Sequence, residues 1–281
     1  MRILILGGSG MLGHQLFKTL CQNNDVKVTL HHYNDHNNDH QLFSSSNSYC
    51  NIDVLDTESL REIMSSYKPE IVLNAIGIIK QREDSKDIVR SLEVNALFPH
   101  RLAILCSDFG ARLIHFSTDC IFSGKKGNYT ETDISDALDL YGKTKFLGEV
   151  LGLNSLTIRS SIIGRELTRH TSLLDWFLNQ SGEVNGFTNS IFSGFTTIEM
   201  SRIVEKVIFQ FPDKSGIYNV SSDPISKFEL LSLIKKIHSL DIEIVPYPNF
   251  YCDRSLNSSN FRREFSYNPP SWPKMISELK V

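Results

Sequence analysis

The sequence predicts an α/β protein, in which a Rossmann-type doubly wound parallel sheet is followed by a smaller C-terminal α/β domain. Two observations support this fold class. Over the first 163 residues, short apolar runs of strand length alternate with helical patterns, which is typical of a parallel sheet with helices on both faces. Gly7, Gly10 and Gly13 stand between the first such run and the first helical pattern, and a glycine-rich turn in that position is typical of dinucleotide sites.

Composition excludes several classes of protein. The chain has 281 residues, of which 41% are apolar and 22% are charged, an ordinary globular composition. Its net charge of −3 provides no basic field for nucleic acid or a membrane surface, and no apolar run reaches membrane-spanning length. The five cysteines are scattered without a Cys-x-x-Cys pair, which favours a reducing compartment over disulfides or a zinc site. We therefore expect a cytoplasmic protein without a metal site.

The glycine turn follows a predicted strand at residues 2–6. Residues 7–13 read G-G-S-G-M-L-G and lead into a helical pattern. Glycines allow a tight turn and let a pyrophosphate approach the backbone at the helix N-terminus. A dinucleotide site is favoured over a plain glycine turn, and the residues expected to contact the dinucleotide are Gly7, Gly10, Met11, Leu12 and Gly13.

The second predicted strand, at residues 26–30, leaves the choice of dinucleotide open. An acidic residue near the end of this strand would bind the ribose of NAD, and an arginine would accommodate the 2′-phosphate of NADP. His31, His32 and Tyr33 stand there instead. We expect NADP(H) or NAD(H), with NADP(H) slightly favoured. The polar segment 34–48 contains His36 and His40, and it is interpreted as a solvated loop rather than a metal site.

The next elements complete the first sheet. A short third strand precedes Asp53 and Val54, a helix capped by Asp56 or Thr57 runs to residue 67, and a fourth strand spans residues 70–73. The small residues of the segment 74–77 would let a cofactor lie against the backbone. A long helix is expected at 87–108, and a fifth strand at 112–116 delivers Ser117 and Thr118 at its carboxyl end, where ligands bind in open parallel sheets.

Tyr141 and Lys145 are the residues expected to perform chemistry. On a helix that begins just before Tyr141, side chains four residues apart project from one face. The adjacent ammonium is expected to lower the pKa of the phenol from its ordinary value of about 10. Thr118 can hold a substrate oxygen near that phenol, so the three residues provide what carbonyl reduction needs. Taken alone, the Tyr–Lys pair is equally typical of a solvated helix face.

The C-terminal part is less regular. We expect a sixth strand at 156–162, a helix with irregular segments over 165–196, and helices at 198–209 and 226–238. Strands are expected at 216–220 and 242–245. The predicted domains are an NAD(P)-binding domain at 1–163, to which a strand near 216–222 returns, and a mainly substrate-binding domain at 164–281.

Several motifs together resemble the dTDP-4-dehydrorhamnose reductase family of extended short-chain dehydrogenases. The resemblance covers nearly the whole chain. The segment from Ser117 to Glu149 is the most specific part of it, whereas the glycine turn is specific only to the superfamily. The matching segments are 7–13, 74–77, 117–119, 121–124, 129–133, 141–145, 148–149 and 254–256.

The resemblance implies an activity and roles for individual residues. Tyr141 would give a proton to the carbonyl oxygen of a nucleotide-linked 4-keto-6-deoxy sugar, Thr118 would bind that oxygen, and Lys145 would bind the nicotinamide ribose. Arg254 would bind the substrate pyrophosphate, although a structural ion pair is nearly as plausible for it. The other implied cofactor-binding residues are Asp53, Val54, Asn74, Ala75, Ile76, Gly77 and Asn95. The other implied substrate-binding residues are Asp119, Cys120 and Ser161.

Two departures from the family pattern leave the substrate open. Cys120 and Ile162 stand where the family has aromatic residues, so an aromatic surface for stacking a sugar is missing. A different 4-keto sugar, such as an N-acetylated one on UDP, is an alternative substrate. A redox-neutral epimerase and a non-catalytic NAD(P)-binding regulatory subunit are the alternative functions, and a homodimer is left open.

Overall fold

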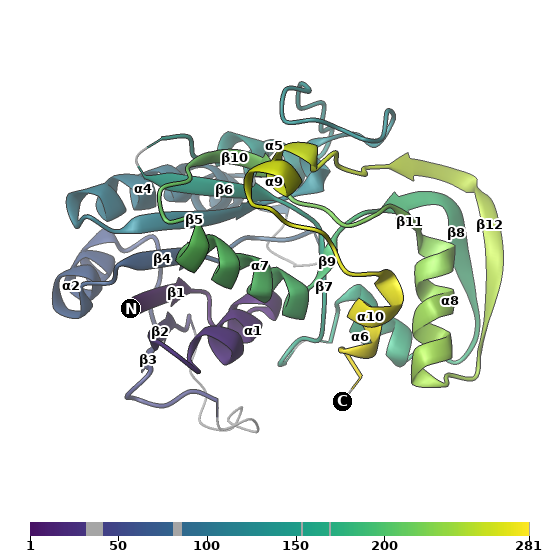
Figure 1. The fold of residues 1–281 in the computed structure, drawn as a ribbon, viewed down its shortest axis with the longest axis horizontal. Helices are drawn as coiled ribbons and strands as arrows, with labels where there is room; N and C mark the ends of the chain where they lie inside the picture. Colours follow the sequence, from purple (N-terminus) through teal and green to yellow (C-terminus); the bar gives the residue numbers. More distant parts are fainter. Residues whose placement is uncertain (32–41, 81–85, 153, 169, 281) are drawn as a thin grey trace.

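A computed structural model describes residues 1–31, 42–80, 86–152, 154–168 and 170–280 (Figure 1). Its main sheet has seven strands in the order β10-β6-β5-β4-β1-β2-β3, and every neighbouring pair is parallel. The strands are β1 (Arg2–Leu6), β2 (Asp25–Thr29), β3 (Ser48–Tyr49), β4 (Ile71–Asn74), β5 (Arg112–Ser117), β6 (Ser155–Arg159) and β10 (Gly216–Asn219). The strand order reverses between β1 and β4, which opens a crevice beyond their carboxyl ends. The predicted doubly wound fold is confirmed.

Alternate residues of β1 enter two separate hydrophobic cores. Ile3 and Ile5 belong to the core that includes α1 (Met11–Leu20) and α7 (Thr197–Gln210). Leu4 and Leu6 belong to a second core, on the face covered by the helices α2 (Thr57–Tyr67) and α4 (Phe98–Asp108). Successive side chains of a strand point to opposite faces, so a sheet covered on both faces requires a continuous apolar run such as that of residues 3–6.

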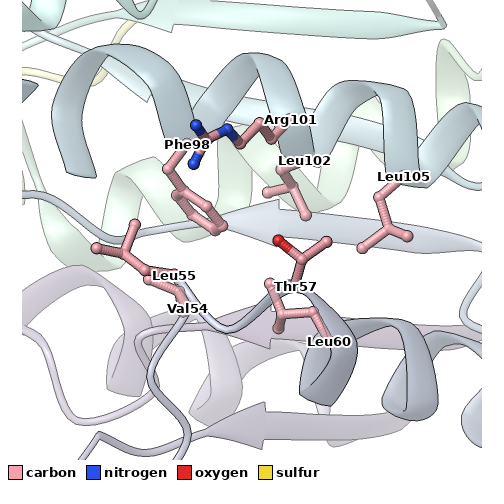
Figure 2. A pocket seen from close by; sticks show the side chains of 8 residues that line it. All are labelled: Val54, Leu55, Thr57, Leu60, Phe98, Arg101, Leu102 and Leu105. Carbon is pink, nitrogen blue, oxygen red and sulfur yellow. The ribbon is translucent and has the colours of Figure 1, made fainter. Parts of the chain in front are cut away.

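In the second core, α2 and α4 pack against each other and leave only a small gap. Figure 2 shows side chains from the two helices pointing toward one another across a small gap. That gap has a volume of only about 10 Å³, roughly the space of one water molecule, and it is lined mainly by apolar side chains. It is a packing defect and not a ligand site.

The predicted helix at 87–108 is interrupted. It consists of α3 (Ile88–Leu92), a π-helical turn at Glu93–Leu97, and α4. Asp87 caps its start by accepting a hydrogen bond from the Arg90 N–H at 3.0 Å. The π-helical turn contains Asn95, and such turns are frequent at functional sites.

The second half of the chain adds two smaller sheets. One has the order β11-β8-β12 and is built from β8 (Gly182–Phe192), β11 (Ile225–Ser226) and β12 (Ile242–Asp253), with α8 (Lys227–His238) packed on it. The other pairs β7 (Ile162–Ile163) with β9 (Phe195–Thr196). The remaining helices are α5 (Leu140–Leu147), α6 (Leu173–Leu178), α9 (Ser259–Glu264) and α10 (Trp272–Ser277).

Three sequence-based expectations need correction here. The segment 165–196 contains the eleven-residue strand β8 in addition to the expected helix. The expected strand at 156–162 is two strands in different sheets, β6 and β7. The expected strand at 242–245 continues to Asp253 as β12, parallel to β8.

One further strand forms as expected, whereas part of the polar segment after the second strand lies outside the described residues. The strand expected at 216–220 forms as β10 and pairs with β6 at the edge of the main sheet. His32, Tyr33, His36 and His40 lie outside the described residues. Among the described helices, none is long and apolar enough to cross a lipid bilayer.

Candidate active site

A cavity of about 1030 Å³ lies at the carboxyl ends of the main strands. Its walls come from the segments that follow β1, β2, β4, β5 and β6, and from residues 166–168 and 171–173, Phe192 and Lys227 in the second half of the chain. This is the edge of an open parallel sheet at which ligands bind, and the volume is large enough for more than one small molecule. The predicted site residues that line it are Gly7, Gly10, Met11, Leu12, Asp53, Val54, Ala75, Ile76, Gly77, Thr118, Cys120, Tyr141, Lys145 and Ser161.

The glycine turn forms one end of the cavity. Gly7 has φ +85°, a conformation that glycine adopts without strain, and its carbonyl accepts a hydrogen bond from the Gly10 N–H at 3.1 Å. A Cβ atom on Gly13 would lie 2.0 Å from the Gly7 oxygen, so Gly13 lets α1 pack against the turn. A Cβ on Gly10 would meet only that same oxygen, at 3.3 Å. The space beside Gly10 therefore opens into the cavity, which fits a pyrophosphate at the start of α1.

Asp53 lies farther along the same wall and is held by two partners. Its carboxylate accepts a hydrogen bond from the Leu55 N–H at 3.0 Å and lies 3.4 Å from the Arg90 guanidinium. Burial alone would raise the pKa of Asp53, but the Leu55 N–H and the Arg90 charge outweigh it and lower the pKa. Asp53 is thus a turn residue that also faces the cavity.

Asn74 and Asn95, two of the predicted site residues, bond the backbone of residues that line the cavity. The Asn74 side chain bonds His115 at 3.1 Å and accepts a hydrogen bond from the Ile76 N–H at 3.2 Å. Asn95 binds both the N–H and the carbonyl of Ile78, at 2.9 and 3.0 Å, and its amide also donates to the Thr144 hydroxyl at 3.3 Å. Neither asparagine lines the cavity. The structure gives both asparagines positioning contacts, and their direct contact with a cofactor stays a prediction from the resemblance.

Thr118, Tyr141 and Lys145 meet on the cavity wall. Helix α5 starts at Leu140 because Asp139 caps it, accepting a hydrogen bond from the Gly142 N–H at 2.9 Å. Tyr141 and Lys145 are thus on one face of α5, as expected, and the Thr118 side chain is near enough to the phenol to affect its pKa. The buried Lys145 ammonium donates a hydrogen bond to the Phe116 carbonyl at 2.6 Å.

The pKa values of Tyr141 and Lys145 differ from the expectation. Burial raises the pKa of Tyr141 well above its ordinary value, the nearby Cys120 and Asp119 raise it further, and only the hydrogen bond with Thr118 opposes them. The expected lowering by Lys145 is therefore wrong for this structure. The ammonium is occupied by the Phe116 carbonyl, and burial lowers its own pKa to about 8 despite the nearby Glu149 carboxylate.

A buried ion pair lies just beyond α5. Glu149 binds Arg159 of β6 through two hydrogen bonds, of 2.8 and 2.7 Å, and both side chains are almost fully buried. Glu149 also accepts a hydrogen bond from the Ser117 hydroxyl at 2.7 Å. The end of α5 is thereby tied to the ends of β5 and β6, from which Thr118 and Ser160 enter the site.

The predicted substrate residues are only partly brought together. Cys120 and Ser161 line the cavity, whereas Asp119 is buried beneath it and accepts a hydrogen bond from Thr118 at 3.2 Å. Arg254 does not line the cavity: its Nε donates to the Phe122 carbonyl at 2.8 Å, and its Nη1 lies 3.9 Å from Cys120 Sγ. The contacts of Arg254 are therefore structural, as in the alternative expected from the sequence. Its partner is a backbone carbonyl, however, and not the carboxylate of an ion pair.

Sequence reasoning missed several polar residues of the cavity. Lys80 lies 5.7 Å from the centre of the Tyr141 ring and forms an ion pair with Asp139 at 2.7 Å. Arg90 and Lys227 also line the cavity. A signal existed for Lys227, because the Ser-x-x-Glu pattern of residues 226–229 is a capping box that places residue 227 at the start of a helix. No local pattern pointed to Lys80 or Arg90.

Sequence comparisons find relatives of two kinds. The dTDP-4-dehydrorhamnose reductase of Aggregatibacter actinomycetemcomitans is 24% identical over 100% of this chain and 98% of its own length. The methionine adenosyltransferase 2 subunit beta of Rattus norvegicus is 30% identical, but over only 53% of this chain and 41% of its own length.

Two solved structures share the fold over 99% of this chain at 19% identity. The dTDP-4-dehydrorhamnose reductase of Bacillus anthracis in complex with NADP has a TM-score of 0.80 and is covered over 98% of its length. The Bordetella bronchiseptica enzyme WbmG in complex with NAD has a TM-score of 0.79 and is covered over 92%. Proteins of this fold thus bind NADP or NAD.

A family model settles the relationship. The RmlD substrate binding domain matches residues 1–164, which is more than half of the chain and includes the glycine turn, Thr118, Tyr141 and Lys145. The chain belongs to this family and is an extended short-chain dehydrogenase/reductase of the dTDP-4-dehydrorhamnose reductase type.

Proposed function

We propose that the protein is an NAD(P)H-dependent reductase that acts on the 4-keto group of a nucleotide-linked 4-keto-6-deoxy sugar, in the biosynthesis of surface polysaccharides or deoxysugars. The observation that carries this proposal is the meeting of Thr118, Tyr141 and Lys145 in the cavity that also contains the glycine turn. A protein that only bound a dinucleotide would not need a phenol, a lysine ammonium and a threonine hydroxyl together on the wall of that cavity.

The three residues would divide the work as follows. When bound, the reduced nicotinamide supplies a hydride to the carbonyl carbon. Tyr141 is protonated at neutral pH, because burial raises the pKa of its phenol, and it would give that proton to the carbonyl oxygen. The Thr118 hydroxyl would hold the same oxygen. The Lys145 ammonium would bind the ribose of the nicotinamide, and Cys120 and Ser161 would contact the sugar.

The two halves of the chain would hold different ligands. Residues 1–163, with β10 added to their sheet, would bind the dinucleotide, and residues 164–281 would supply most contacts to the substrate. The open space beside Gly10 suits a pyrophosphate, and Asp53 and Val54 suit the adenosine. The cofactor would be NADP(H) or NAD(H), with NADP(H) slightly favoured.

A panel assay tests this function. Purified protein is mixed with NADPH or NADH and with 4-keto-6-deoxy sugars linked to dTDP or UDP, with and without an N-acetyl group, and the absorbance of the reduced nicotinamide is followed. We expect oxidation of one cofactor with at least one sugar. No oxidation with any pair would remove the reductase, and tightly bound oxidised cofactor in the purified protein would favour an epimerase.

A regulatory subunit is the second candidate, because the similarity to methionine adenosyltransferase 2 subunit beta spans half of this chain. A protein of that kind would bind the dinucleotide and reduce none of the sugars. The intact Thr118, Tyr141 and Lys145 favour the enzyme.

A further inference from the structure

Lys227 is a cation of the cavity wall that the proposed reduction does not use. It is the first residue of α8 and enters the cavity from the smaller sheet. A capping box fixes its backbone, because the Ser226 hydroxyl and the Glu229 N–H bond at 3.1 Å and the Glu229 carboxylate accepts from the Ser226 N–H at 3.0 Å. The backbone of Lys227 is therefore fixed at the start of α8, so its side chain leaves the helix from a defined position on the cavity wall.

The ammonium of Lys227 has an aromatic partner but no close anion. Its Nζ lies 4.3 Å from the centre of the Phe192 ring. In the described part of the chain, no carboxylate lies within ion-pair distance of it. Burial lowers the pKa of Lys227, and the negative charge of Asp119 only partly opposes that effect. A partly desolvated cation of this kind gains much from an anionic ligand.

Arg254, another cation near this end of the cavity, has different contacts. Its guanidinium is committed to the Phe122 carbonyl at 2.8 Å and to Cys120, and it lies outside the cavity lining. Of these two cations, Lys227 alone faces the cavity, beside the segment Thr118–Cys120 where the substrate carbonyl is proposed to lie.

The geometry points to Lys227 as the residue that binds a phosphate of the substrate's nucleoside diphosphate, in place of Arg254. This role rests on the proposed function, because it assumes a nucleotide-linked substrate. Lys227 is thus a positioning residue: it would hold the diphosphate so that the attached sugar reaches Thr118 and Tyr141. A carboxylate on the sugar itself is the competing source of negative charge.

Calorimetric titration separates these possibilities without any turnover. The ligands are dTDP and UDP, with thymidine and uridine as phosphate-free controls, and the variants are Lys227→Met and Lys227→Arg. Lys236→Met, an exposed lysine of the same helix, is the matched control for net charge. We expect Lys227→Met to bind the preferred diphosphate about tenfold to a hundredfold more weakly, which is the scale of a charge-assisted hydrogen bond. Lys227→Arg should recover most of the affinity, and Lys236→Met should match the wild type.

Three results would overturn this role. They are undiminished diphosphate affinity in Lys227→Met, an equal loss of affinity for the nucleosides or for NADPH, and a wild-type protein that binds neither dTDP nor UDP. If the wild type instead binds a diphosphate through Lys227 but reduces no sugar, the proposed reduction fails and the role of Lys227 stands.

Discussion

Gly10 and Gly13 belong to one motif, but the structure gives them different neighbours. Gly13 contacts the Gly7 backbone, whereas Gly10 faces open space and has an ordinary extended conformation, with φ −69° and ψ 162°. Gly13 therefore serves the folded structure, and Gly10 leaves space for a ligand. Sequence spacing alone predicted the same role for both.

We predict that Gly10→Val folds normally but binds NADPH or NADH at least about tenfold more weakly, because its branched side chain would occupy the pyrophosphate's place. Gly13→Ala is the matched comparison: its Cβ would overlap the Gly7 oxygen, so it should lose about 1–3 kcal/mol of unfolding free energy. Fluorescence titration and thermal denaturation of both variants check this. A Gly10→Val protein with wild-type cofactor affinity would contradict the assignment.

Lys145 predicts a dependence of activity on pH. Burial lowers the pKa of its ammonium to about 8, so in the folded protein the charge is present below that pH and is lost above it. If the cation is needed, kcat/KM should fall as pH rises through about 8, since this parameter reports groups of the free enzyme. Lys145→Met should have low activity without this decline. A wild-type kcat/KM that stays constant to pH 10 or so would exclude a required ammonium with this pKa.

At the scale of elements, helix α5 is anchored by the Glu149–Arg159 ion pair, which is almost fully buried. We predict that Glu149→Gln loses about 3–5 kcal/mol of unfolding free energy, because it leaves the Arg159 charge buried without its partner. Asp108→Asn removes the exposed Arg61–Asp108 pair, of 3.6 Å, and should cost less than about 1 kcal/mol. Denaturant unfolding measures both variants, and similar losses for the two would mean that burial of the pair is unimportant.

The elements differ in how well sequence predicts them. Strands β1, β4 and β5 are buried on both faces and read as apolar runs, so the sequence located them to within a residue or two. Strand β8 was missed because its eleven residues include Gly182, Gly186, Asn185 and Asn189, which disfavour strands. It forms because β11 and β12 pair with it, and Gly186 leaves room for Phe228 of α8. Such tertiary pairings cannot be read from a local pattern.

At the scale of the molecule, the sequence could predict only those site residues that belong to a motif. The glycine turn, Thr118, Tyr141 and Lys145 were found because their spacing is local or family-specific. Lys227 is 86 residues from Tyr141 in the sequence and reaches the cavity only because the smaller sheet is placed beside the main one. For the same reason, Arg254 was expected at the substrate although its side chain does not line the cavity. Its position in the sequence does not reveal the direction of its side chain.

The two halves of the chain share one core, so we predict that neither folds alone. Residues of α7 and β8 belong to the same hydrophobic cluster as β1 and α1, and β10 covers the edge of β6 (Figure 1). A fragment of residues 1–163 would lack α7 and β10 and should show no cooperative thermal transition by circular dichroism. A fragment that melts sharply would show that the first half is an independent domain.

The most direct test of the central claim, that a buried phenol completes carbonyl reduction in this cavity, is a paired measurement on Tyr141→Phe. Turnover of the best sugar and affinity for the reduced cofactor are measured in the same preparation. We predict that turnover falls by about a hundredfold or more while cofactor affinity stays within a few-fold of wild type, because only the proton donor is lost. Undiminished turnover by Tyr141→Phe would contradict the account.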